Sequence, residues 1–199
     1  MPSTHGMVIC KNPNRHWARY MRVETDVRSD LLELLQDNTK DERILPLIEQ
    51  LEPMQPADLR RDRESLTGAW ELRWSSSKQP WLKQAPWLEN LQLLDLERGR
   101  GMNLLRPKGF LSSIAAISVQ ADLAVLDQKR VEVKFRTGGW VGPTLPSGRR
   151  LKLFKEVTQS FPAWLDITIL DEKLRVCRGN AGTIFALTRR MDISIDSLM

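Results

Sequence analysis

Two kinds of hydrophobic periodicity divide this chain into a helical front and a strand-rich body. From Asp26, apolar residues recur at spacings of three and four, which predicts an amphipathic helix, and Ile44–Leu51 has the pattern of a second, shorter one. Pro53 and Pro56 end this part. Because such short helices bury little surface alone, we expect residues 26–66 to pack against the body that follows.

From Thr67 the period changes to two, which is typical of strands with one apolar face. Trp70, Leu72 and Trp74 alternate with Ala69, Glu71 and Arg73, and similar alternation with intervening turn signals recurs in residues 117–125, 131–136, 151–153, 165–169, 174–176 and 183–189. About eight or nine short antiparallel strands fit a sandwich or a barrel. We expect residues 67–190 to form the barrel, because closure buries the apolar faces and leaves no edge. The predicted fold class is therefore mainly β, an antiparallel β-barrel preceded by short N-terminal α-helices.

The two ends of the chain carry weaker patterns. No acidic residue precedes Glu24, and Asn12-Pro13-Asn14 is expected to break a helix, so we predict a basic, disordered arm over residues 1–25. This arm is short for a targeting peptide. Residues 191–199 are expected to form a C-terminal tail after the last strand.

Charge is distributed unevenly along the chain. The formal net charge is +5, and it divides into +3 for residues 1–28, −5 for residues 29–66 and +7 for residues 67–199. A basic body favours an anionic partner such as a lipid surface, an acidic protein or nucleic acid, although a solvated surface with a small charge excess fits equally well. The longest run without an ionisable side chain covers residues 109–121, too short for the roughly 20 residues of a membrane-spanning helix, so no transmembrane segment is expected.

Catalytic chemistry has few candidate residues. The only imidazoles are those of His5 and His16, in the N-terminal arm, and the two cysteines, Cys10 and Cys177, are far apart in the sequence. We therefore predict no catalytic triad, no metal site, no cofactor and no enzymatic activity. The aromatic residues alternate with aliphatic ones as in a core, which is not typical of a nucleic-acid surface, so no nucleic-acid partner is expected.

Two segments carry a family resemblance. Residues 66–76 (LTGAWELRWSS) and 164–179 (WLDITILDEKLRVCRG) resemble the two signature segments of the plastid lipid-associated proteins, also called plastid fibrillins. Residues 93–103 and 182–189 are similar to the middle strand pair and the last strand of that family, and the resemblance covers roughly residues 28–190. The signature positions singled out are Gly68, Trp70, Asp171, Arg175, Gly179 and Arg189.

The resemblance implies both a fold and a role. It implies a lipocalin-like barrel of plastids and cyanobacteria, peripheral to thylakoid membranes or lipid globules, that binds carotenoids, quinones, fatty acids or other lipids. Because no long transit peptide is seen, a cyanobacterial origin and a place on the cytoplasmic side of the thylakoid are expected. Trp74 and Ile169 stand where that family usually has Tyr, so hydrogen bonds from those hydroxyls are not expected here.

The signature residues are expected to be structural. The Gly68-x-Trp70 opening also resembles the first strand of lipocalins, in which an Arg from the last strand lies over the Trp indole at the barrel floor. Here Arg189 is the first candidate for that partner and Arg178 the second. Asp171 and Arg175 are expected to brace a hairpin turn as a pair.

Two surfaces are candidate binding sites. Strand parity places eight residues on the apolar face as ligand-binding candidates: Leu72, Trp74, Val133, Phe135, Leu151, Leu153, Ile167 and Phe185. Trp81, Trp87 and Trp140 lie in apolar loops and are candidates for membrane docking, although they could equally pack back on the barrel mouth.

These features support more than one function. The first hypothesis is non-enzymatic binding or carriage of a small hydrophobic molecule. The second is a structural protein that coats a membrane or lipid globule and holds no internal ligand. A barrel-type chromophore lyase is a third, based on architecture alone.

Overall fold

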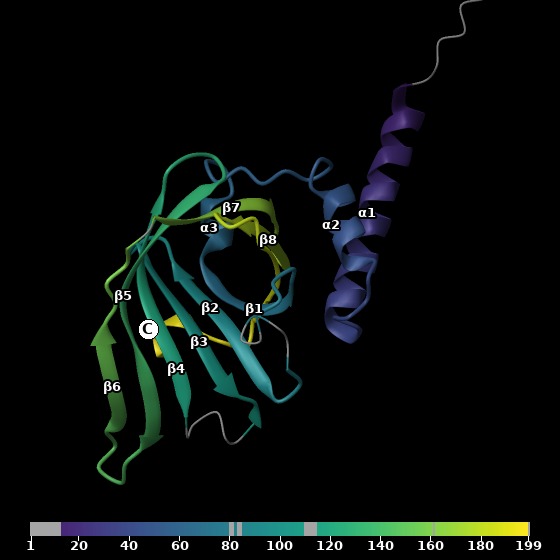
Figure 1. The fold of residues 1–199 in the computed structure, drawn as a ribbon. Helices are drawn as coiled ribbons and strands as arrows, with labels where there is room; N and C mark the ends of the chain where they lie inside the picture. Colours follow the sequence, from purple (N-terminus) through teal and green to yellow (C-terminus); the bar gives the residue numbers. More distant parts are fainter. Residues whose placement is uncertain (1–12, 80–81, 83–84, 110–114, 161, 199) are drawn as a thin grey trace, which may run out of the picture.

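Three helices and nine strands make up the described part of the chain. The computed structural model describes residues 13–79, 82, 85–109, 115–160 and 162–198. The helices are α1 (Pro13–Asp37), α2 (Ile44–Leu51) and α3 (Arg63–Leu66), and a 3₁₀ turn, η3 (Ile195–Ser197), lies near the C-terminus. The strands are β1 (Gly68–Ser75), β2 (Leu88–Asp95), β3 (Arg100–Pro107), β4 (Ala116–Val125), β5 (Arg130–Thr144), β6 (Arg150–Glu156), β7 (Ala163–Leu170), β8 (Leu174–Gly179) and β9 (Ile184–Arg189) (Figure 1).

The strands close into a ring. Their order is β4-β3-β2-β1-β9-β8-β7-β5-β6, every neighbouring pair is antiparallel, and β4 also pairs with β5. Eight strands therefore form a closed barrel, and β6 is attached outside the ring. The predicted mainly β fold, an antiparallel barrel that follows N-terminal helices, is confirmed (Figure 1).

Strand β5 is longer than the barrel wall needs. Its first part, from Arg130 to Val133, pairs with β7, whereas residues 137–144 pair with β6. Because β4 pairs with both parts of β5, the β5–β6 hairpin extends the sheet beyond the ring, as Figure 1 shows. Side chains of β6 are consequently exposed, including those of Leu151 and Leu153.

Two of the β-bulges in the sheet change which side chains of β1 and β7 point into the barrel. The register of β1 against β9 shifts between Leu72 and Trp74, and that of β7 against β8 shifts between Ile167 and Ile169. A bulge adds one residue to a strand and so reverses the face of the residues that follow. Leu72 and Ile167 therefore belong to the core inside the barrel, whereas Trp74 and Ile169 pack on the outer face, under the helices.

Helices α1 and α2 cover one outer face of the barrel. Leu31, Leu35 and Ile48 are fully buried there against a wall that includes Val176 of β8 and Ala186 of β9. The helices and the outer face of this part of the barrel therefore share one hydrophobic cluster, which is distinct from the core inside the barrel. The free energy of folding of this front comes from that shared surface rather than from helix propensity.

The first helix begins earlier than expected. It starts at Pro13, so residues 13–25 are helical, whereas the sequence pattern predicts a disordered arm up to residue 25. Proline is accepted in the first turn of a helix, where its missing N–H is not needed, so Asn12-Pro13-Asn14 does not prevent the helix from starting there. The first turns of α1 project away from the barrel in Figure 1, and Tyr20, Met21 and Val23 are exposed.

The described residues close one end of the barrel and leave the other end uncovered. Leu59 and Leu66, from the segment around α3, pack with the fully buried Trp70 across one end. Ser75 of β1 lies opposite Phe185 of β9, so the β1–β2 connection and the β8–β9 turn meet at the other end. We call this second end the mouth.

The tail packs against the outside of the barrel. Ile193, Ile195 and Leu198 lie over an apolar patch that includes Leu93 of β2 and Met102 of β3. Residues 191–198 are therefore part of the folded structure, because they cover apolar side chains that the outer faces of β2 and β3 would otherwise expose.

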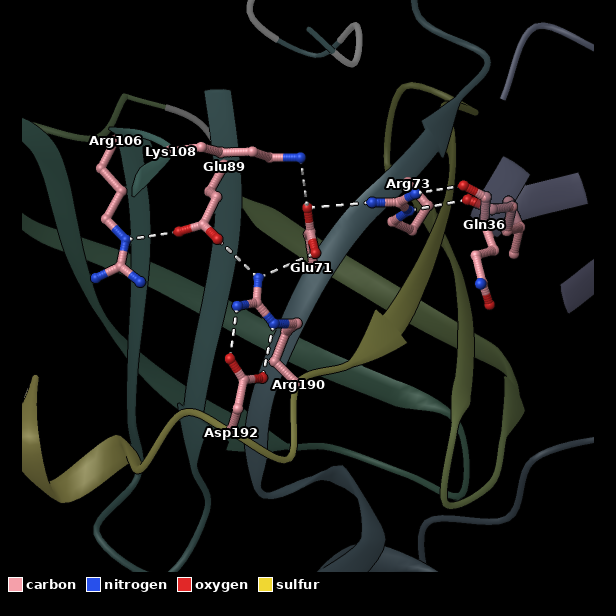
Figure 2. Close-up of polar contacts among 9 residues, drawn as sticks. Gln36, Glu71, Arg73, Glu89, Arg106, Lys108, Arg190 and Asp192 are labelled. Atoms are coloured by element: carbon pink, nitrogen blue, oxygen red, sulfur yellow. Dashed lines mark hydrogen bonds and ion pairs between the residues drawn. The ribbon is translucent and has the colours of Figure 1, made fainter. Parts of the chain in front are cut away.

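An ion-pair network joins the tail, the sheet and α1 (Figure 2). Nη1 of Arg190 lies 3.1 Å from the Glu71 carboxylate and 2.8 Å from that of Glu89, and its Nη2 lies 2.7 Å from Asp192. Arg73 lies 3.3 Å from Glu71 and donates hydrogen bonds of 2.8 Å to the carbonyls of Leu35 and Gln36 at the end of α1. The network therefore fixes α1 and the tail to the same two strands.

Arg190 is the cation that contacts the most carboxylates in this network. The pKa of Asp192 is lowered to about 2 by its hydrogen bond with Arg190. Burial works to raise the pKa of Glu89, but hydrogen bonds from Arg190 and Arg106 hold it below its usual value. Glu71 and Glu89 are both buried, and Arg190 is the cation that contacts both of them.

Candidate ligand pocket inside the barrel

The barrel contains one mainly apolar pocket between its mouth and its closed end. Its volume is about 480 Å³, which lies within the range of small-molecule sites. Residues of β2, β3, β4, β5, β7, β8 and β9 form its wall. Gln79, Leu82, Asn180 and Ala181 line it at the mouth. The wall residues are Gln92, Leu94, Gly101, Met102, Asn103, Val119, Ala121, Leu123, Val133, Phe135, Ala163, Trp164, Leu165, Gly179, Thr183 and Phe185.

Three of the eight predicted ligand-binding residues line this pocket. They are Val133 and Phe135 of β5 and Phe185 of β9, which the fold brings together from distant parts of the chain. Leu72 and Ile167 face inward as expected but lie in the packed core. Both side chains are buried in that core, so they support the pocket but do not form its wall.

The other three predicted residues lie elsewhere. Trp74 points outward because of the bulge in β1 and packs against the helices. Leu151 and Leu153 lie on β6, which is outside the closed ring, and their exposed fractions are 41% and 70%. Strand parity within one strand cannot show that a bulge precedes a residue or that its strand lies outside the ring.

Several wall residues were not predicted as ligand contacts. Val119 and Leu123 of β4 and Leu165 of β7 belong to alternating segments, so parity alone could have placed them on the same face. Gln92 carried no such signal, because it is a polar residue between Leu91 and Leu93. In the structure those two leucines face the tail, and Gln92 faces the pocket.

The closed end is built on Trp70. The Arg189 guanidinium carbon lies 4.6 Å from the centroid of the Trp70 ring, which is the pairing expected from the sequence. Trp70 Nε1 donates a 3.0 Å hydrogen bond to the Leu66 carbonyl, and Arg189 Nη1 donates one of 3.0 Å to that of Thr67. A cation over an indole stabilises such a site by about 0.5–2 kcal/mol.

Gly68 is required by this same arrangement. Its φ of 142° is one that side chains rarely adopt, and a Cβ there would lie 2.7 Å from Nη1 of Arg189. The absence of a side chain at Gly68 therefore lets Arg189 reach its place over Trp70.

The second arginine beside Trp70 is Arg175, not Arg178. The Arg175 guanidinium carbon lies 5.2 Å from the Trp70 ring centroid, on the inside of the barrel. Arg178 instead forms a two-bond ion pair with Glu52 of the helical front, with distances of 2.9 and 2.7 Å. Alternation along β8 explains the difference, since Arg175 and Cys177 face inward and Leu174 and Val176 face the helices.

The expected pair of Asp171 and Arg175 does not form. Asp171 accepts hydrogen bonds of 2.7 and 2.9 Å from Arg28 of α1, and two more from the backbone N–H groups of Lys173 and Leu174. Burial acts to raise the pKa of Asp171, but these hydrogen bonds keep it below its usual value. Asp171 therefore braces the β7–β8 turn and fixes α1, and Arg175 is left inside the barrel.

Exposed apolar residues gather toward the mouth. Ile117 of β4, Trp140 of β5 and Leu153 of β6 are register partners and form a row across three strands. Their exposed fractions are 55%, 36% and 70%, and Trp87, just before β2, is 67% exposed. Trp81, the third predicted docking residue, lies outside the described residues.

This exposed row continues the pocket wall. Ile117 lies two residues before Val119 on β4 with no register shift between them, so both face the same side of the sheet. Val119 lines the pocket. An apolar surface therefore runs from inside the barrel past its mouth and onto the β5–β6 hairpin.

The fold and the pocket define a class of protein: a closed antiparallel barrel with an internal apolar cavity, sealed at one end and not covered at the other by the described residues. The PAP_fibrillin family model matches residues 30–188, and the chain belongs to this family of lipid-associated proteins. Its members are generally non-enzymatic, with structural or binding roles. A comparison with curated proteins finds no match, and none of the described helices is long and apolar enough to span a membrane.

Proposed function

We propose that this protein binds a small hydrophobic molecule in the barrel pocket, without catalysing a reaction on it. The observation that carries this proposal is the apolar cavity of about 480 Å³ that opens at the mouth. Transfer of an apolar chain from water into such a pocket is favourable by about 25 cal/mol per Å² of buried surface. A carotenoid, a quinone, a fatty acid or another lipid has this chemistry, and the site of action would be a thylakoid or lipid-globule surface.

A pocket-filling substitution tests this function. In Val119→Trp, an indole replaces a small side chain on the pocket wall, so the variant is expected to bind a neutral apolar fluorophore, N-phenylnaphthylamine, at least about tenfold more weakly. The measurement is a fluorescence titration of the purified protein. The matched control is Gln120→Trp, which adds the same side chain to the exposed outer face of the same strand. Equal affinities of Val119→Trp and the unchanged protein would reject the pocket as the binding site.

A second candidate function is association with a lipid surface through the mouth. The row of Ile117, Trp140 and Leu153 favours it, because large apolar side chains rarely stay in water without a partner surface. Lys152 and Lys155 flank Leu153 on β6 and are exposed, which would add attraction to anionic headgroups. This surface would bring the pocket mouth to the source of its ligand.

Vesicle binding tests this second function. Leu153→Ser is expected to lower partitioning into phosphatidylglycerol-containing vesicles by about tenfold, because it removes a side chain whose full burial contributes about 1.5–3 kcal/mol. Sedimentation of protein with vesicles measures the bound fraction. Leu126→Ser is the matched control, because Leu126 is 58% exposed but lies at the β4–β5 turn, at the opposite end of the barrel. A similar loss in both variants, or none in either, would contradict docking through the mouth.

A further inference from the structure

Arg175 is a buried cation that no carboxylate contacts in the part of the chain that the structure describes. Its exposed fraction is zero, and its Nε and Nη1 groups have no hydrogen-bond partner among the described residues. Burial lowers the pKa of Arg175 to about 10, and the neighbouring cation Arg189 acts in the same direction. A buried charge usually has a partner, because the transfer of an isolated ion out of water is costly.

Gln92 connects this cation to the pocket. Nη2 of Arg175 donates a hydrogen bond to Oε1 of Gln92, and Gln92 is part of the pocket wall. Since Oε1 is taken by Arg175, the group that Gln92 can still offer a ligand is its Nε2 donor. Asn103, its register partner on β3, lines the same part of the wall.

The free groups at this position are therefore donors. Nε and Nη1 of Arg175 and Nε2 of Gln92 can donate hydrogen bonds, and none of the ion pairs among the described residues brings a carboxylate to Arg175. Each edge of a guanidinium that donates two parallel hydrogen bonds to one carboxylate includes Nη2, so a carboxylate can take such an edge of Arg175 once Gln92 releases Nη2, which then donates together with Nε or Nη1. The rest of the wall is mainly apolar, so the complementary molecule has one anionic end and one long apolar part.

We propose that the pocket selects a long-chain fatty acid that enters with its carboxylate first, and that this carboxylate is held by Gln92 and Arg175. A change of the Gln92 rotamer brings the headgroup against the guanidinium, while the chain lies along Leu94, Val119 and Phe185 toward the mouth. The ligand then supplies the counter-charge that the protein lacks. This inference rests on the proposed function, because it names the ligand class of the same pocket.

Competition between an acid and an alcohol tests the proposal. A long-chain fatty acid and the primary alcohol of equal chain length each displace N-phenylnaphthylamine from the purified protein, and the unchanged protein is expected to bind the acid at least about tenfold more tightly. In Gln92→Glu the protein provides its own carboxylate for Arg175, so the preference for the acid is expected to disappear while the affinity for the alcohol remains. This variant adds a partner to a buried charge, which favours its folding.

Two further variants separate the possible outcomes. Arg175→Met removes the cation at similar volume and is also expected to abolish the preference for the acid. Gln120→Glu makes the same charge change on the outer face of β4 and is expected to keep it. Equal binding of acid and alcohol by the unchanged protein, or a preference that survives in Gln92→Glu and Arg175→Met, would overturn the proposal and leave the proposed function intact. Failure of the fluorophore itself to bind would instead reject the pocket function.

Discussion

Replacement of Arg190 by Met is expected to lower the free energy of unfolding by about 3 kcal/mol. Arg190 contacts the buried carboxylates of Glu71 and Glu89 at 3.1 and 2.8 Å, and it lies between the strands and the tail. Removal of the cation takes away the one group that contacts both carboxylates, and leaves Glu71 with Arg73 and Lys108, and Glu89 with Arg106. The lower end of the range for broken buried ion pairs applies, because 23% of the Arg190 side chain is exposed.

Urea unfolding followed by circular dichroism measures this loss. Arg61→Met is the control, because Arg61 pairs with Asp62 at the surface with 74% of its side chain exposed, so a change within about 0.5 kcal/mol is expected. In a second variant, Glu89→Gln is added to Arg190→Met, and part of the stability is expected to return because one of the two buried carboxylates that Arg190 contacted no longer carries a charge. Equal stability of the Arg190→Met and Arg61→Met proteins would show that the ion pairs of Arg190 do not stabilise the packing of the tail on the strands.

The overall architecture could be predicted because the signals for it are local. A period of two with one apolar face is a property of each strand by itself, and burial of many such faces requires closure or stacking. The turn at residues 171–173 and the helix at Ile44–Leu51 follow equally from neighbouring residues. These features needed no knowledge of which distant segments meet.

The pocket could be predicted only in part because bulges and partner strands depend on the whole fold. Trp74 continues the alternation of Trp70 and Leu72 in the sequence, yet one extra residue in β1 turns it outward. Leu153 has the parity of a wall residue, but β6 lies outside the ring. A strand pattern gives the face of a residue relative to its neighbours, and only pairing decides what that face meets.

The partners of the charged residues could not be predicted from the neighbouring sequence. The spacing of Asp171 and Arg175 suggests a pair across a turn, whereas the carboxylate is held by Arg28, which is 143 positions away in the sequence. No described carboxylate therefore pairs with Arg175, a property that depends on the whole surroundings of the guanidinium and not on the local sequence. The selectivity proposed for the pocket thus depends on a contact that the sequence does not show.

Replacement of Trp70 by Ala is expected to cost about 4 kcal/mol of unfolding free energy. The Trp70 side chain is fully buried, packs with Leu59 and Leu66 at the closed end of the barrel, and donates a hydrogen bond to the Leu66 carbonyl. Its loss leaves a cavity and also removes the ring that Arg175 and Arg189 face at 5.2 and 4.6 Å. Both guanidinium groups would then lie beside a void, in which neither gains a new partner.

Trp87→Ala provides a control of the same chemistry, because Trp87 is 67% exposed and a change within about 0.5 kcal/mol is expected. Urea unfolding measures both variants, and the fluorophore titration reports whether the pocket survives. If Trp70 seals the barrel, Trp70→Ala loses stability and also binds the fluorophore more weakly, because solvent reaches the pocket from its closed end. If Trp70→Ala were as stable as Trp87→Ala, then Leu59, Leu66 and the two arginines would close the barrel without the indole.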